Sequence, residues 1–254
     1  MPLTAFIFQP FEDAAEAVIN FFQSDVGLSW GLSIIALTFA VRIVLLPLSL
    51  RGIRSMRKLQ LVAPQLKEIQ ERYKDDRERQ QREMLKLYQE NGVNPLASCF
   101  PFLLQIPFFI AIYQLLRSTS FEEDVINSGA DQGFLFIQSV IEKPQGAETV
   151  ILIVLFISTT IASFLYTTAT TATAQGAQRY IFLALPVLFA PFIISQPAGL
   201  GLYWIATNVW SLLQQIVVQR IMPAPPPPTE EELAERRKQV APPPPPPRKK
   251  KKRR

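Results

Sequence analysis

Apolar residues are distributed along the chain in membrane-length runs that charged segments separate. The first run extends from Trp30 to Leu50 and has about the twenty apolar residues that a helix needs to cross a hydrocarbon core. Four later runs of similar character follow. The predicted spans are residues 30–50, 96–116, 149–167, 180–195 and 200–221. The pattern therefore predicts an all-α polytopic membrane protein with five transmembrane helices, a cytoplasmic helical hairpin and a disordered C-terminal tail.

A single charge interrupts the first run. Arg42 precedes Arg51 by nine residues, which at about 1.5 Å per residue places it roughly 14 Å from the predicted membrane boundary. A guanidinium group does not lose its proton, and placing it in mid-bilayer costs at least about 2.5 to 3.5 kcal/mol. Such a residue usually has a function and faces water or protein. The alternative is that its side chain reaches the cytoplasmic headgroups.

The first segment, residues 1–28, has four acidic residues and no lysine or arginine. Because a secretory signal peptide begins with a basic region, we expect this segment to stay in the mature protein. Apolar side chains recur at helical spacing opposite the acids, at Phe11, Ala15, Val18, Ile19 and Phe22. The spacing predicts a short amphipathic helix at the extracytoplasmic surface of the membrane, with an irregular segment as the alternative.

Residues 51–94 form the longest charged segment between spans, with eleven lysines and arginines against seven acids. The positive-inside rule places this segment in the cytoplasm and the N-terminus outside. Two apolar stripes separated by Asp75 and Asp76 predict a helical hairpin that Gly92 ends. Pro64 is expected to break or kink the first arm.

The charged faces of this hairpin have two interpretations. The pairs Glu68–Arg72 and Glu78–Arg82 have the i,i+4 spacing that stabilises a helix in water. These faces are therefore either simply solvated, which is common, or a docking platform for partners at the cytoplasmic surface.

The C-terminal segment, residues 222–254, is proline-rich and ends in a basic cluster. The cluster comprises Arg248, Lys249, Lys250, Lys251, Lys252, Arg253 and Arg254. Proline runs form stiff, extended spacers, so we expect the cluster to lie away from the bilayer. It is suited to binding RNA, and so a ribosome, or anionic lipid. A disordered tail that only reinforces the topology is the alternative.

Several kinds of chemistry are excluded by composition. The chain has no histidine, and Cys99 is its only cysteine. Metal sites built on histidine or paired cysteines, and serine–histidine proteolysis, are therefore excluded. No Gly-Lys phosphate-binding loop is present. We expect no cofactor, no metal and no enzymatic activity.

Polar side chains of other spans lie at nearly the same predicted depth as Arg42. Gln105 is about nine residues into the second span, and Asn208 falls slightly deeper in the fifth. No span contains an acid that could pair with the arginine. The pattern favours a wet, positively charged groove, although interhelical hydrogen bonding alone would also explain the amides. The candidate groove residues are Arg42, Gln105, Thr159, Ser163, Tyr203, Trp204, Asn208 and Gln214.

A set of motifs between residues 28 and 221 resembles a known family. They are Arg42-Ile-Val-Leu-Leu-Pro47-Leu, Pro64 to Lys74, Leu87-Tyr88 with Asn91 to Ala97, Gln105-Ile-Pro107, and Pro197 to Trp204 with Asn208 and Gln214-Gln215. The chain is similar to the YidC-type (YidC/Oxa/Alb) membrane protein insertases. It resembles their short, Gram-positive-like bacterial forms, because it lacks a large periplasmic domain with an extra span and a lipobox cysteine.

The resemblance implies an insertase and chaperone of the bacterial plasma membrane. It implies that Arg42 sits in a hydrophilic groove open to cytoplasm and lipid but closed to the outside, and that substrate helices leave along the third and fifth spans. The implied partners are nascent membrane proteins with short acidic outer tails, the ribosome, the SecYEG translocon and anionic lipids, with a monomer as working unit. A small anion transporter or channel is the alternative function, because one buried arginine would suffice for it.

Overall fold

The computed structural model describes residues 3–92, 94, 100–171, 177–221, 223 and 231. The chain divides into two compact units, Met1–Ala224 and Pro225–Arg254. Cys99 and the basic cluster 248–254 lie outside the described residues. The fold below is that of the first unit.

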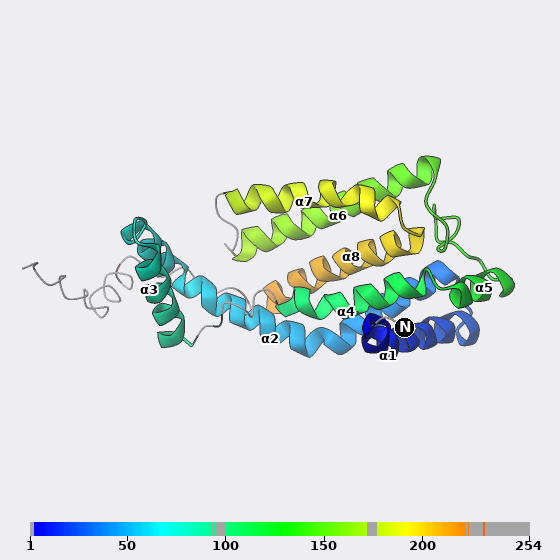
Figure 1. The fold of residues 1–254 in the computed structure, drawn as a ribbon, viewed down its shortest axis with the longest axis horizontal. Helices are drawn as coiled ribbons and strands as arrows, with labels where there is room; N and C mark the ends of the chain where they lie inside the picture. Colours follow the sequence, from blue (N-terminus) through cyan, green and yellow to red (C-terminus); the bar gives the residue numbers. More distant parts are fainter. Residues whose placement is uncertain are drawn as a thin grey trace, which may run out of the picture. The chain divides into compact units, whose positions relative to one another are not determined.

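Helices are the regular elements of this unit (Figure 1). Their bounds are α1 Leu3–Asn20, the π-helical turn η1 Phe21–Asp25, α2 Trp30–Arg72, α3 Arg77–Glu90, α4 Phe100–Leu115, α5 Thr119–Asn127, α6 Gly146–Thr171, α7 Ala177–Ile194 and α8 Ala198–Ile221. In the described part of the chain, β pairing is limited to an isolated bridge between Phe134 and Ile137. The predicted all-α class is confirmed.

Two stretches among the described residues are long and apolar enough to cross a membrane. They are Trp30–Leu59 within α2 and Gly146–Thr168 within α6. Shorter apolar stretches are Gln105–Leu115 in α4 and Leu183–Ile194 in α7. The number of five spans stays a prediction.

Helix α2 is longer than the sequence pattern predicts. It begins after Ser29, whose hydroxyl accepts a hydrogen bond from the Leu32 amide (3.3 Å), and it continues for 43 residues through Pro47 and Pro64. The helix thus joins the predicted first span to the first arm of the hairpin. The predicted break at Pro64 is wrong, because Pro64 does not end the helix, and a kink there stays a prediction. A proline removes one helical hydrogen bond, and apolar packing of the flanking turns against α3 offsets that loss.

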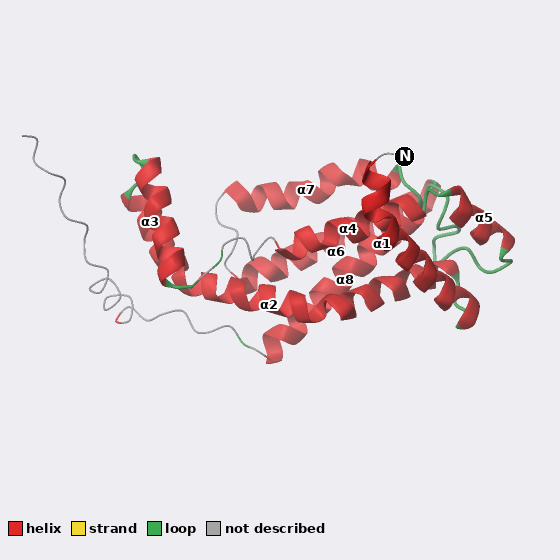
Figure 2. Ribbon diagram, turned by 60° about the horizontal axis from the view of Figure 1, so that its bottom comes forward, coloured by secondary structure: helices red, strands yellow, loops and turns green. Residues whose placement is uncertain are grey.

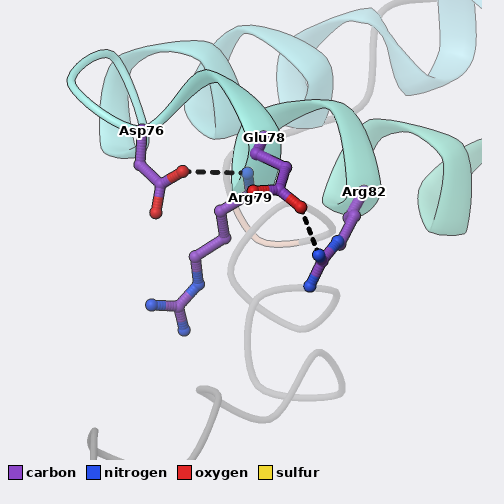
Figure 3. A network of polar contacts seen from close by, with 4 residues as sticks. All are labelled: Asp76, Glu78, Arg79 and Arg82. Carbon is purple, nitrogen blue, oxygen red and sulfur yellow. Dashed lines mark hydrogen bonds and ion pairs between the residues drawn. The ribbon is translucent and has the colours of Figure 1, made fainter.

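Helix α3 folds back on the C-terminal part of α2. Val62 of α2 and Leu87 of α3 are buried in one apolar cluster, against which Leu59, Leu66, Ile69 and Tyr88 pack. The Asp76 carboxylate caps α3 by accepting a hydrogen bond from the Arg79 amide (3.0 Å; Figure 3). Gly92 follows the helix with φ +59°, a conformation that suits glycine after a helix C-terminus.

Both predicted i,i+4 ion pairs are present on this hairpin. Arg72 pairs with Glu68 and Arg82 with Glu78 (Figure 3). The side chains of Arg82 and Glu78 are 76% and 78% exposed, so water screens their attraction. We expect Arg82→Ala to change the free energy of unfolding by at most about 0.5 kcal/mol. A double-mutant cycle with Glu78→Ala measures the coupling free energy of the pair. Hydrogen exchange of the α3 amides provides the stability of each variant. A coupling clearly above about 1 kcal/mol would contradict a solvated surface pair.

Of the remaining helices, α6, α7 and α8 lie lengthwise beside one another, as Figures 1 and 2 show. Helix α8 contacts α6, α2 and α7, and α6 also contacts α7. Helix α1 lies against α4 and α2, with Ala15 and Ile19 buried. The helical prediction for the N-terminal segment is confirmed for residues 3–20, and protein covers part of the apolar face of α1. Its placement at a membrane surface stays a prediction.

The segment between α5 and α6 caps two helix starts (green loops in Figure 2). The Asp131 carbonyl accepts from the Trp30 amide of α2 (2.9 Å). The carbonyls of Glu142 and Val140 accept from the first amides of α8, at 2.7 and 2.9 Å. Ile137 and Val140 of this segment are buried. Because the first amides of a helix have no partner within it, this segment, residues 128–142, acts as a cap on α2 and α8; we call it the loop cap.

Candidate functional site

Arg42 lies on α2 and is half-buried. Within the part of the chain that the structure describes, its guanidinium makes no hydrogen bond or ion pair. The group that interacts with it electrostatically is the Tyr203 side chain of α8. A half-buried cation without an anionic partner favours the approach of a negative or polar group from outside the protein.

Tyr203 is the residue at which three helices meet. Its ring is buried in α8, and its hydroxyl accepts a hydrogen bond from the Gln105 side-chain amide of α4. Arg42 of α2 lies near enough to Tyr203 for the two side chains to interact electrostatically. The structure thus brings together Arg42, Gln105 and Tyr203, which the sequence placed on separate spans; we call them the polar triad.

Asn208 and Thr159 lie at the contact between α8 and α6. The Asn208 amide donates to the hydroxyl of Thr160 (2.7 Å) and, at 3.4 Å, to that of Thr159. One heptad later, Thr167 donates to the Gln215 side-chain oxygen (2.7 Å). These bonds satisfy the amides between two helices, the interhelical alternative raised by the sequence. A role of Asn208 and Thr159 in a groove stays a prediction.

Trp204 belongs to an aromatic cluster that joins four helices. Its ring contacts Phe109 of α4, Phe156 of α6 and Phe189 of α7, with centroids 5.2, 5.8 and 5.9 Å away. Such contacts add packing energy to a large buried area. The side chain of Trp204 therefore packs between helices.

The last two candidates are bonded within their own helices. The Gln214 side-chain oxygen accepts from the Trp210 indole (2.9 Å), and the Trp210 ring contacts Phe39 of α2. Ser163 is half-buried, and its carbonyl accepts from the Thr167 hydroxyl (2.7 Å). The structure thus does not bring Gln214 or Ser163 to the polar triad by any direct hydrogen bond that it describes.

Three residues of the α6–α8 contact were absent from the predicted site: Thr160, Thr167 and Gln215. The sequence carried a signal for them. Phe156 with Trp204, Thr160 with Asn208 and Thr167 with Gln215 all have a separation of 48 residues. Both helices therefore repeat the same spacing, as expected for helices that run in the same direction in register.

We expect Asn208→Ala to act on stability more than on function. Loss of an interhelical hydrogen bond inside a membrane protein costs about 0.6 to 1.7 kcal/mol. Thermal unfolding in detergent micelles would show a lower midpoint, with Leu213→Ala, exposed on the same helix, as control. If Asn208→Ala instead removed function at unchanged stability, Asn208 would belong with the polar triad.

Comparison with known proteins assigns the family. The sequence model of the family described as 60Kd inner membrane protein matches residues 21–225, more than half of the chain. The chain belongs to this family. The YidC-type family that its motifs indicated is thereby confirmed, because similar proteins carry that name.

Two of these relatives are named membrane protein insertase YidC. The protein of Streptomyces avermitilis is 36% identical over 232 residues, which cover 80% of this chain and 54% of that protein. The protein of Helicobacter pylori is 37% identical over 206 residues, covering 81% of this chain and 35% of that protein. The chain thus spans about half or less of the length of these YidC relatives.

A solved structure of the YidC-type family has the same fold. It is described as an active YidC insertase crystal structure with the first transmembrane domain resolved. The match has a TM-score of 0.60 at 28% sequence identity, and it covers 80% of this chain and 45% of that one. The helical fold of this chain is therefore a YidC-type fold.

Proposed function

We propose that this chain inserts newly made membrane proteins into the bacterial plasma membrane, and assists their folding, through a positively charged groove that the polar triad lines. The observation that carries the proposal is Arg42, a half-buried cation without an ionic partner among the described residues. An acidic or polar substrate tail would gain an attractive partner at this depth. No catalytic step is required, because insertion changes no covalent bond.

The groove is proposed to shorten the apolar barrier that a substrate tail must cross. Arg42 draws the tail into a wet region, so that the outer part of the membrane alone is left to cross. Burial of the substrate's own span drives the step, at about −0.3 to −0.6 kcal/mol for each of its most apolar residues. A membrane potential that is positive outside adds about 2.3 kcal/mol per acidic charge per 100 mV.

The substrate helix is proposed to leave along α6 and α8. Apolar side chains of these two helices are exposed, and they include Val154 and Leu165 of α6 and Leu213 and Val217 of α8. Such a surface suits an apolar helix or lipid. The hydrogen bonds between α6 and α8 would keep it intact while a substrate moves across it.

The proposed topology is multi-pass, with the N-terminus outside and the C-terminus in the cytoplasm. The α2–α3 hairpin is proposed to dock cytoplasmic partners. The ribosome and anionic lipids are proposed partners of the basic cluster, SecYEG is a further proposed partner, and the working unit is proposed to be a monomer.

Insertion into liposomes tests the function directly. The purified full-length chain is reconstituted, and a short single-span substrate with an acidic outer tail is added. We expect insertion above that of protein-free liposomes, and less insertion when the tail acids are replaced by lysine. Equal insertion with and without the protein would refute the proposal.

The alternative function of an anion channel or transporter has less support. Carbonyls of the loop cap, residues 128–142, accept hydrogen bonds from the first amides of α2 and α8. Ile137 and Val140 of this segment are buried. This packing opposes a continuous pore. An anion-flux assay on the same liposomes separates the two functions, since flux without insertion would favour the channel.

A further inference from the structure

A cavity of about 100 Å³ lies between α1, α2, α4 and α8. Tyr203 of the polar triad forms part of its wall. The other wall residues come from α1, α2 and α4, and include Phe11, Ala14, Val41, Phe108 and Ala111. The cavity therefore adjoins the proposed groove at Tyr203.

The interior of this cavity is apolar. Thr38 and Tyr203 are the polar side chains in its wall. The Thr38 hydroxyl donates to the Ile34 carbonyl (2.7 Å), and the Tyr203 hydroxyl accepts from Gln105. A buried water needs two to four polar partners, and an apolar cavity without them stays dry. Hydrocarbon is therefore the chemical class that this cavity suits.

The cavity reaches the surface of the protein beside α1. Phe11 is 37% exposed and Ala14 is also exposed, yet both lie in the cavity wall. The Phe11 ring packs edge-on against Phe108 of α4, with centroids 5.6 Å apart. A group that approaches along α1 can thus enter between Phe11 and Ala14.

We propose that this cavity binds the end of an acyl chain of a membrane phospholipid. Its size selects this occupant, because a helix with side chains is about 10 to 12 Å across, whereas an engineered cavity of about 150 Å³ holds one benzene molecule. The end of a single alkyl chain is the apolar group of this size that a bilayer supplies in excess. The proposal goes beyond insertion and does not depend on it.

The site is tested with phospholipid that carries a photoactivatable diazirine near the end of one acyl chain. The full-length protein is reconstituted with this lipid and irradiated, and the labelled peptides are identified by mass spectrometry. We expect label on the cavity walls of α1 and α4. Leu188 of α7, 73% exposed, provides the internal standard for ordinary contact with lipid.

Two matched variants decide whether the label comes from the cavity. Ala14→Leu places a larger side chain at the opening, and Ala17→Leu makes the same change at an exposed position of α1 outside the cavity wall. We expect Ala14→Leu to lower the cavity label several-fold relative to Leu188, and Ala17→Leu to leave it unchanged. Equal label in both variants, or no cavity label in the wild type, would overturn the proposal.

A second filling variant and a second probe guard against misfolding and against a different occupant. Ala111→Leu fills the cavity from α4, where Ala111 is buried, and is expected to lower the label in the same way. Benzoylphenylalanine in place of Phe108 is expected to capture lipid; capture of a substrate span would overturn the lipid assignment. Insertion by the wild-type protein is measured in a separate assay. If the wild type carried the cavity label but inserted no substrate, the insertase function would be refuted and the lipid site would stand.

Discussion

Arg42→Ala is expected to lower insertion of a short single-span substrate with an acidic outer tail at least about tenfold, since a hydrogen bond to a charged group contributes about 1.5 to 3 kcal/mol. Arg42→Lys should retain part of the activity. Lysine keeps the positive charge but lacks the planar fork that binds a carboxylate through two bonds. The measurement is protease protection of the substrate in liposomes that hold equal amounts of folded wild type or variant.

Arg51→Ala is the matched control for this series. Arg51 lies nine residues further along the same helix and is exposed, so its loss removes an equal charge from the predicted membrane boundary. We expect insertion close to that of the wild type. If Arg42→Ala also inserted normally, Arg42 would only be reaching the headgroups, and the apolar surface of α6 and α8 would have to carry the mechanism.

Substrates are expected to differ in how strongly their insertion depends on the charge of Arg42. A substrate whose outer tail is neutral gains little from Arg42, so its insertion should differ less between wild type and Arg42→Ala. The attraction between Arg42 and an acidic tail is screened less than that of surface charges, because the side chain is half-buried. The difference between the two substrates should therefore persist in moderate salt.

Helices could be predicted from the sequence more reliably than their ends. Apolar periodicity located the helical segments, and the i,i+4 pairs Glu68–Arg72 and Glu78–Arg82 formed as spaced. The continuity of α2 through Pro64 was missed. Sequence rules for a single helix include the hydrogen bond that proline removes. They do not include the packing of Val62 against Leu87, because Leu87 belongs to another helix.

The candidate site was predicted as one set of polar residues, and the structure divides it. Depth along each span placed Arg42 at the level of Gln105; Gln105 bonds Tyr203, and Arg42 interacts electrostatically with the same side chain. Depth alone does not say which way a side chain faces around the helix. Asn208 lies on the side of α8 that meets α6, where it binds Thr160. The angular position, which follows from pairing the two helices in register, was the missing quantity.

The loop cap, residues 128–142, could not be predicted from sequence patterns. Its bonds run from carbonyls of residues 128–142 to amides of Trp30, Ala198 and Gly199. Backbone groups carry no sequence signature, and every residue offers the same carbonyl. The cap leaves one mark on the sequence, which is a small residue where the cap approaches a helix closely. Gly31 is such a residue.

Gly31→Ala is expected to destabilise the protein, although replacing glycine by alanine usually stabilises a helix. A β-carbon at Gly31 would lie 2.5 Å from the Phe134 β-carbon and 2.7 Å from the Gly133 carbonyl oxygen. Alanine normally gains about 0.8 to 1.0 kcal/mol over glycine in a helix, whereas overpacking costs about 1 to 3 kcal/mol. Because one of the two neighbours is backbone, we expect the cost to prevail and the unfolding midpoint to fall.

Hydrogen exchange and a neighbouring variant show whether the cap is the cause. The Trp30 amide donates to the Asp131 carbonyl, so displacement of the cap by Gly31→Ala should speed exchange at Trp30 while exchange in α3 stays constant. Leu32→Ala changes the next, more exposed residue of α2. It should neither displace the cap nor speed exchange at Trp30. A raised unfolding midpoint for Gly31→Ala would mean that helix propensity dominates and that residues 128–142 do not pack tightly on α2.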